Sequence, residues 1–197
     1  MRIFLAGATG LIGTRLTRLM QGDGHVVAAM TRTPSKIDGL RAAGVTPVLC
    51  NLFEPEALVA AVREFHPDLV VHQATDLPDQ VEVLDEYLPR NNRVRSEGTR
   101  NLLAAAKAAN VPGILAQSIA WRTGPGTGPV LDAHEHAVTA AGGIVLRYGA
   151  FYGPETYFPK DPPPHPRIHV DAAARRTMPH LAGRSGIFTI TEDDAAS

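Results

Sequence analysis

Apolar and polar positions alternate along the chain with two different periods. Short apolar runs, typical of buried strands, occur at residues 2–6, 25–30, 46–49, 68–74, 114–118 and 144–148. Apolar residues at helical spacing, typical of amphipathic helices, occur at residues 11–22, 35–43, 54–65, 92–109 and 131–141. Buried strands separated by helices predict a doubly wound α/β fold, in which a parallel sheet lies between two layers of helices.

Two proline-containing regions interrupt this pattern. A polar stretch follows the fourth apolar run, and Pro89 predicts a break in it before the helix at 92–109 begins. Residues 154–166 hold six prolines, which predicts a loop or an extended segment. Beyond them we expect a helix over 171–181 that ends early at Pro179, and a short strand over 186–191.

The junction between the first strand and the first helix is rich in glycine. It reads Gly-Ala-Thr-Gly-Leu-Ile-Gly over residues 7–13. Gly7 permits a tight turn, Gly10 lets a pyrophosphate approach the backbone, and Gly13 lets the helix pack closely on the strand. The first N–H groups of a helix lack internal partners and lie at the positive end of its dipole, so they stabilise an anion. This junction therefore predicts a dinucleotide-binding site.

Composition excludes several classes of partner. The 197 residues include 19 basic and 20 acidic side chains, so charge gives no reason to expect a nucleic acid or an anionic membrane surface as partner. No apolar run approaches the roughly 20 residues that span a bilayer. The glycine turn interrupts the N-terminal apolar run, unlike a signal peptide, and we expect a cytoplasmic protein. Cys50, the single cysteine, is expected as a small core residue rather than a reactive thiol.

Several further motifs follow the glycine turn in a recognisable order. They are Asp-Leu-Val-Val-His-Gln-Ala at 68–74, Glu-Gly-Thr-Arg-Asn-Leu-Leu at 97–103, Gln-Ser at 117–118, Leu-Arg-Tyr-Gly-Ala-Phe-Tyr-Gly-Pro at 146–154 and Ile-His-Val-Asp at 168–171. In this order the chain resembles the extended or atypical NAD(P)-dependent epimerase/dehydratase branch of the short-chain dehydrogenase/reductase superfamily. The resemblance implies a Rossmann fold, a bound NAD(P) and a small-molecule substrate.

The resemblance also implies roles for individual residues. Ser118 matches the active-site serine of the family, which hydrogen-bonds the reacting oxygen of the substrate. Tyr148 begins the segment that meets the nicotinamide end of the cofactor. The glycine turn contributes Gly7, Thr9, Gly10, Leu11, Ile12 and Gly13 to the cofactor site, and the end of the fourth strand contributes His72, Gln73, Ala74 and Thr75.

The residues after the second strand favour NADP over NAD. An NAD site usually places an acidic residue about 20 residues beyond the glycine turn. The chain has Arg32 in this region and no carboxylate before Asp38. Arg32 suits a 2′-phosphate, although a solvated loop arginine is the simpler alternative. Asn51 and Leu52 match the adenine-contacting position, where Asn51 fits equally well as a capping residue for the helix at 54–65.

The catalytic pattern of the family is incomplete in this chain. No Tyr-x-x-x-Lys pair occurs, and the expected helix reads Val-Leu-Asp-Ala-His-Glu-His-Ala-Val over 130–138. His134 and His136 lie two positions apart on a helix, so they do not converge as a metal pair, and each is more easily read as a surface histidine than as a catalytic one. Tyr148 and Tyr152 are hydroxyl acids that are more often packing residues, and Trp121 suits a stacking or a core role.

These observations leave three functions open. The first is an atypical NAD(P)-dependent oxidoreductase or epimerase that acts on a sugar nucleotide or a small carbonyl compound. The second is a non-catalytic NADP(H)-binding sensor or interaction protein, and the third is a shortened gene product with impaired binding. We expect an NAD(P)-binding domain at 1–153 and a reduced remnant of a substrate lobe at 154–197. A homodimer is also left open.

Overall fold

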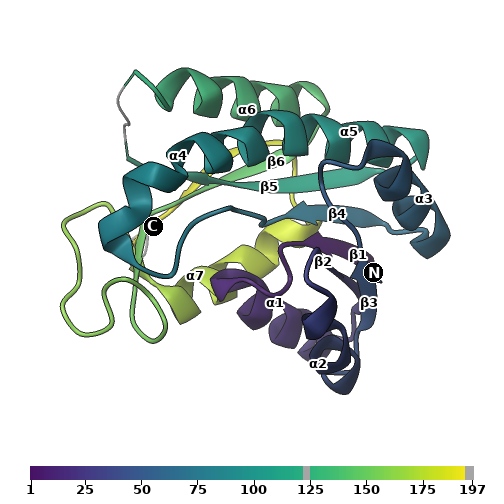
Figure 1. Ribbon diagram of the computed structural model, residues 1–197, viewed down its shortest axis with the longest axis horizontal. Helices are drawn as coiled ribbons and strands as arrows, with labels where there is room; N and C mark the ends of the chain where they lie inside the picture. The colour runs from purple at the N-terminus through teal and green to yellow at the C-terminus, as the bar shows by residue number, and fades with distance from the viewer. Residues whose placement is uncertain (122–124, 194–197) are drawn as a thin grey trace.

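A seven-stranded parallel sheet forms the centre of the molecule (Figure 1). The computed structural model describes residues 1–121 and 125–193. The strand order is β3-β2-β1-β4-β5-β6-β9. The bounds are β1 (Arg2–Ala6), β2 (Val26–Thr31), β3 (Thr46–Leu49), β4 (Leu69–His72), β5 (Gly113–Ile119), β6 (Ile144–Tyr148) and β9 (Gly186–Ile190). The predicted doubly wound α/β fold is confirmed.

Helices cover both faces of this sheet (Figure 1). One face carries α1 (Leu11–Gly22), α2 (Ile37–Ala42) and α7 (Val170–Thr177), and the other carries α3 (Pro55–Phe65), α5 (Thr99–Ala108) and α6 (Gly128–Ala140). Alternation along β1 explains the two layers, because successive strand residues point to opposite faces. Ile3 and Leu5 pack with α1, whereas Phe4 and Ala6 pack with α3 and α5.

The break expected at Pro89 is wrong. Pro89 lies inside α4 (Leu84–Arg93), which continues through a π-helical turn at Val94–Gly98 into α5. A proline at this position removes one N–H, and the carbonyl that loses its partner belongs to Asp85, an exposed residue where water can take the place of the missing donor. The buried Asn91 side chain also anchors α4, because its Oδ1 accepts a hydrogen bond from the Asp76 N–H.

The C-terminal part completes the sheet instead of standing apart from it. β9 pairs with β6, and α7 packs against α1. Residues 154–166 contain no helix or strand, as predicted. The helix expected over 171–181 ends at Thr177, and a 3-10 helix at Met178–Ala182 follows it. A small sheet of β7 (Ala150–Tyr152) and β8 (Arg167–His169) was not expected.

Two smaller expectations have outcomes here. Cys50 is buried in the core on the α3 and α5 side, which confirms its packing role, and burial raises the pKa of its thiol. In residues 1–121 and 125–193, no helix is long and apolar enough to cross a membrane.

Candidate functional site

The glycine turn lies at the carboxyl end of β1, between the ends of β2 and β4. Gly7 has φ +87°, and a Cβ there would lie 2.5 Å from the Ala74 nitrogen. A Cβ on Gly13 would lie 2.0 Å from the Gly7 carbonyl oxygen. Gly10 differs, since its Cβ would meet nothing described closer than 3.4 Å. Packing therefore requires Gly7 and Gly13, whereas a Cβ at Gly10 would make only an ordinary van der Waals contact.

Gly10 is exposed and lies at the start of α1. Gly10 is the N-cap residue, and it has no side chain to cap the helix. The first helical hydrogen bond runs from the Thr14 N–H to the Gly10 carbonyl at 3.0 Å. The N–H groups of Leu11, Ile12 and Gly13 precede this bond and have no partner within the helix. Such an arrangement fits a pyrophosphate, because it combines unpaired N–H donors with the positive end of a helix dipole.

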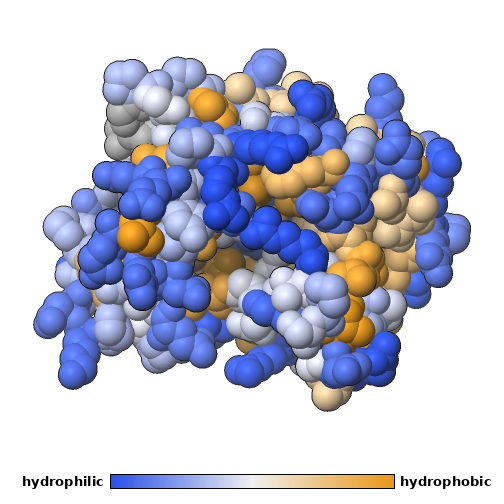
Figure 2. Space-filling view, viewed as in Figure 1, coloured by the Kyte–Doolittle hydropathy of each residue, from blue (hydrophilic) through white to orange (hydrophobic). Residues whose placement is uncertain are grey.

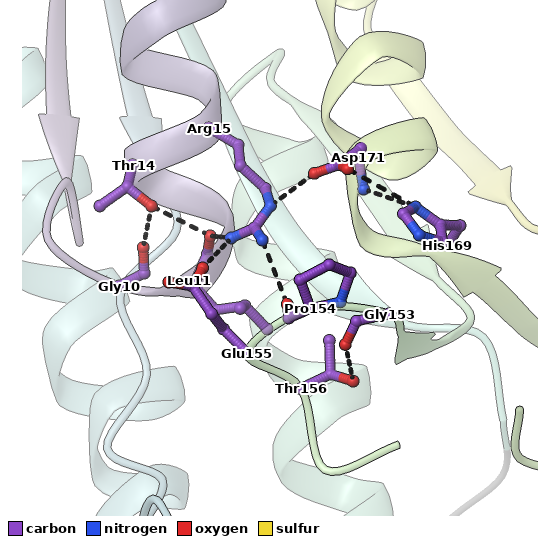
Figure 3. A network of polar contacts seen from close by, with 10 residues as sticks. All are labelled: Gly10, Leu11, Thr14, Arg15, Gly153, Pro154, Glu155, Thr156, His169 and Asp171. Carbon is purple, nitrogen blue, oxygen red and sulfur yellow. Dashed lines mark hydrogen bonds and ion pairs between the residues drawn. The ribbon is translucent and has the colours of Figure 1, made fainter. Parts of the chain in front are cut away.

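Arg15 ties this helix to the C-terminal part of the chain (Figure 3). Its Nε donates to Asp171 of α7 at 2.7 Å, and its Nη1 lies 3.0 Å from the Glu155 carboxylate. Its Nη2 donates to the Pro154 carbonyl and its Nη1 to the Leu11 carbonyl. One guanidinium group thus joins the first turn of α1, the loop after β7 and the start of α7, so residues far apart in sequence hold the glycine turn in place.

The end of β4 supplies the residues expected at the ribose. His72 is fully buried, and neither of its ring nitrogens has a hydrogen-bond partner among the described residues. Burial and the neighbouring His134 ring lower the pKa of His72 to about 3. Ala74 packs against Gly7 through its backbone. His72 therefore supports the strand end as a neutral buried ring.

Gln73 connects this strand end to Tyr148. Its Nε2 donates to the Tyr148 hydroxyl oxygen at 3.2 Å, and its Oε1 is buried without a partner among the described residues. The Tyr148 hydroxyl lies 2.6 Å from Thr177 Oγ1. Thr177 donates its own proton to the Ala173 carbonyl, so Tyr148 is the donor to Thr177. Burial raises the pKa of Tyr148 to about 12, and its hydroxyl stays protonated.

Arg32 meets a carboxylate that sequence reasoning missed. Its Nη2 donates to Asp76 Oδ1 at 2.9 Å, and Arg90 of α4 donates to both oxygens of the same carboxylate at 3.1 and 3.2 Å. Burial alone would raise the pKa of Asp76, but the hydrogen bonds and charges of the two arginines outweigh it and lower that pKa. Arg32 is thus fixed in an ion pair, which differs from the solvated loop charge considered as its alternative.

Asn51 and Leu52 lie at the end of β3. Asn51 Oδ1 accepts from the Phe53 N–H at 3.2 Å, so its side chain shapes the turn before α3. The N-cap residue of α3 is Glu54, which makes no side-chain capping bond. Leu52 is buried, and its carbonyl accepts from the Asn101 side chain at 2.8 Å. The adenine-contacting role of both residues stays a prediction.

Ser118 lies at the end of β5, fully buried. Its hydroxyl donates to Glu135 Oε1 at 2.6 Å, and Arg147 of β6 binds both oxygens of this carboxylate. Burial alone would raise the pKa of Glu135, but the hydrogen bonds from Arg147 and Ser118 lower it below its ordinary value. Sequence reasoning missed Glu135, because its partners Ser118 and Arg147 lie on two other elements.

A cavity of about 490 Å³ opens beside this cluster. Glu135 and Arg147 form its charged wall, and Asp132 lies on it too. The apolar wall includes Trp121, whose stacking or core role was left open, and Ile119, Pro125, Pro129 and Leu131. Ser118 is near but does not line it. The cavity is therefore large enough for a small molecule, and Asp132, Glu135 and Arg147 are the charged residues that line it.

His134 lies on the helix that lacks the tyrosine and lysine, and it is buried, so its interpretation as a surface histidine is wrong. His134 Nε2 donates to the Gln117 carbonyl at 2.9 Å, so Nδ1 accepts from Thr99 Oγ1 at 2.8 Å. Burial lowers the pKa of His134, which is neutral in this arrangement. His136 is exposed on the outer side of the helix. These two histidines do not converge.

The parallel sheet, the glycine turn and the open helix N-terminus define a dinucleotide-binding α/β protein. A family model described as NAD(P)H-binding matches residues 7–140, and the chain belongs to this family. The NAD(P)-binding domain that the expected relationship implies is confirmed.

Individual relatives extend this result. A 3-diazoavenalumate denitrifying reductase from a Streptomyces species is 34% identical over 185 residues, which cover 82% of this chain and 60% of that protein. A 3-beta-hydroxysteroid dehydrogenase from Mycolicibacterium neoaurum is 30% identical over 112 residues, which cover 56% of this chain and 30% of that one. The chain thus spans less than two thirds of either relative.

Solved structures show the same fold. The UDP-glucose 4-epimerase of Thermus thermophilus, in complex with NAD, superposes with a TM-score of 0.77 at 21% identity. The match covers 97% of this chain and 78% of that one. At this identity the likeness establishes the fold.

Proposed function

We propose that the protein binds NADP(H) and acts as an oxidoreductase or epimerase-like enzyme on a small carbonyl compound or a sugar nucleotide. The observation that carries this proposal is the glycine turn. Gly7 and Gly13 are required by the packing of the chain, but the space at Gly10 has no such structural reason. A pyrophosphate that accepts hydrogen bonds from the start of α1 explains that space.

Arg32 supports NADP as the cofactor. It follows β2 directly, and its side chain is 50% exposed although Asp76 holds it in place. A guanidinium group can bind a phosphate with two parallel hydrogen bonds, so Arg32 suits the 2′-phosphate that distinguishes NADP from NAD. The cofactor would supply hydride transfer at its nicotinamide when bound.

The proposed chemistry at the substrate uses the cluster beside the cavity. The name of the Streptomyces relative, a reductase, supports a redox reaction. Arg147 lines the cavity, and its guanidinium group has donors beyond those bound to Glu135 with which to hydrogen-bond a substrate oxygen. Ser118 keeps the role that the family resemblance gives it, as the hydroxyl nearest the reacting oxygen, and Glu135 orients it.

A non-catalytic NADP(H)-binding sensor is the second candidate. The observation that favours it is the state of Ser118, which is fully buried and already donates its proton to Glu135. No tyrosine or lysine on α6 replaces it as a proton donor. A sensor needs only the cofactor half of the molecule.

Titration of NADPH and NADH into the protein tests the cofactor assignment. We expect Arg32→Ala to weaken NADPH binding roughly tenfold or more, the loss typical of one charge-assisted contact, and to leave NADH binding within about twofold. Arg41→Ala is the matched control, because Arg41 also pairs with one aspartate, Asp38, on an exposed surface. Equal affinities of the unmodified protein for both cofactors would overturn the choice of NADP.

Oxidation of bound NADPH in the presence of a panel of carbonyl compounds tests catalysis. An enzyme should turn over at least one of them, and Ser118→Ala should abolish turnover while leaving NADPH affinity unchanged. Tight NADPH binding without turnover of any compound supports the sensor instead.

A further inference from the structure

Arg32, Asp76 and Arg90 form a cluster that we call the clasp. Arg32 follows β2 and Asp76 lies just beyond the end of β4, and these two strands flank β1 in the sheet. The clasp therefore bridges the crevice at the end of β1, where the glycine turn lies. Figure 2 shows strongly hydrophilic side chains crossing this face of the molecule.

The charges of the clasp are unequal. Two guanidinium groups share one carboxylate, and each of them contacts both of its oxygens. Asp76 is nearly buried, with 10% of its side chain exposed, whereas Arg32 and Arg90 are 50% and 54% exposed. The cluster therefore carries one surplus positive charge, and its exposed part is mainly arginine.

The position of Arg90 is held by contacts other than Asp76. Its guanidinium group lies 4.7 Å from the centre of the Tyr87 ring on the same helix. Asn91, the next residue, accepts from the Asp76 N–H at 3.1 Å, so α4 and the segment after β4 are joined through the backbone as well. If the carboxylate left the arginines, the Tyr87 ring and the backbone of α4 would still hold Arg90 near the end of β4.

We propose that Arg90 is the second arginine of the 2′-phosphate site and that the Asp76 carboxylate occupies its place until the cofactor arrives. This inference rests on the proposed NADP(H) binding and adds two residues to it. A phosphate monoester carries up to two negative charges and three acceptor oxygens, so two arginines bind it better than they bind one carboxylate. The phosphate exchanges with the Asp76 carboxylate, whereas NAD, which lacks this phosphate, leaves the carboxylate paired with both arginines.

Calorimetric titration of the full chain with NADPH and with NADH tests this exchange. Arg90→Ala should weaken NADPH binding at least tenfold and change NADH binding less than twofold. Asp76→Asn removes the competing charge and keeps the backbone bond to Asn91, so it should tighten NADPH binding about threefold to tenfold. Arg41→Ala and Asp38→Asn, which break a separate arginine–aspartate pair, should change neither affinity.

Other outcomes separate this inference from the proposed function. If the unmodified protein binds neither cofactor, or binds both equally, the NADP(H) proposal fails and the exchange fails with it. If Arg32→Ala weakens NADPH binding but Arg90→Ala does not, the exchange alone is wrong. Weaker NADPH binding by Asp76→Asn would also overturn it, because Asp76 would then support the site rather than compete for it.

A conservative variant guards against misfolding. Arg90→Lys keeps the positive charge but loses the paired donors of the guanidinium group. We expect it to weaken NADPH binding by an intermediate factor with an unchanged melting temperature. NADPH binding by Arg90→Lys that equals the unmodified protein's, together with full loss in a destabilised Arg90→Ala, would show that Arg90 acts through folding and would overturn the proposal.

Discussion

Two arginine–carboxylate clusters lie at the carboxyl ends of the strands, and they differ in how well their charges are balanced. The clasp of Arg32, Asp76 and Arg90 has two arginines for one acid, and the arginine side chains are half exposed. The cluster of Ser118, Glu135 and Arg147 has one arginine for one acid, and the serine hydroxyl satisfies the carboxylate further. The clasp retains a surplus positive charge that can bind an anion, whereas the charges of Glu135 and Arg147 balance each other.

This difference follows the division between cofactor and substrate chemistry. The glycine turn and the clasp belong to the half of the crevice that would hold a dinucleotide, and both offer unsatisfied positive charge. The α6 half lacks the tyrosine and lysine of the family, and the Ser118 hydroxyl already donates its hydrogen bond to Glu135. Binding of a cofactor is therefore better supported by the structure than a particular catalytic step.

Substitution of the glycines gives the largest expected effect and tests the cofactor half. Gly13→Ala places a Cβ 2.0 Å from the Gly7 carbonyl oxygen, and this contact with rigid backbone should cost about 3 kcal/mol in the free energy of unfolding. Gly10→Ala should cost within about 1 kcal/mol, since its Cβ meets only ordinary contacts. Urea denaturation measures both.

Cofactor titration of Gly10→Ala completes this test. Its Cβ would fill the space that we assign to the pyrophosphate, so NADPH affinity should fall roughly tenfold, about 1.4 kcal/mol. Gly22→Ala, at the end of α1 in open space, is the control and should keep full affinity. Unchanged NADPH binding by Gly10→Ala would place the pyrophosphate elsewhere.

The α6 cluster should respond differently to loss of its acid and of its serine. Glu135→Gln removes the hydrogen-bonded counter-charge of Arg147 and leaves only the charge of Asp132 near it. It should cost about 2 kcal/mol in stability, less than a fully buried pair, because 34% of the Arg147 side chain is exposed. Ser118→Ala leaves the ion pair intact and should cost about 1 kcal/mol. If Ser118→Ala destabilises the protein as much as Glu135→Gln does, the ion pair is not the centre of this cluster.

Patterns local in sequence were sufficient to predict most of the fold. Apolar runs and helical spacing located the seven parallel strands, because burial on both faces of a sheet imposes a strong signal. The break predicted at Pro89 was wrong because α4 continues through this residue. A hydrogen bond from the Asp76 N–H to the Asn91 side chain, which is distant in sequence, stabilises the helix there. The short strands β7 and β8 gave no periodic signal, since each has only three residues.

The candidate site was predictable only where one segment forms it. The glycine turn was found because its residues are contiguous. The acidic residue of an NAD site was looked for near the end of β2, where the chain has Arg32. The carboxylate that pairs with Arg32 belongs to Asp76, which follows β4. A sequence does not show which strands become neighbours. Glu135 was overlooked for the same reason, because its partners Ser118 and Arg147 lie on two other elements.

His72 lies between the glycine turn and α6. Its substitution gives the smallest expected effect, a change in how stability depends on pH. Its ring contacts that of His134 with centroids 5.9 Å apart, while the next residue, Gln73, lies behind the glycine turn. The folded protein holds the pKa of His72 at about 3, against an ordinary histidine value of 6.5. Between these values the unfolded chain binds a proton that the folded chain does not, so stability falls as the pH drops below about 6.5.

The slope should reach about 1.4 kcal/mol per pH unit for this one histidine. His72→Leu removes the titrating group from a site where neither ring nitrogen is paired among the described residues, so the variant should lose less stability than the unmodified protein between pH 7.5 and 5. Urea denaturation at several pH values measures these slopes, and equal slopes for His72→Leu and the unmodified protein would mean that His72 takes up its proton in the folded state, as an exposed histidine does.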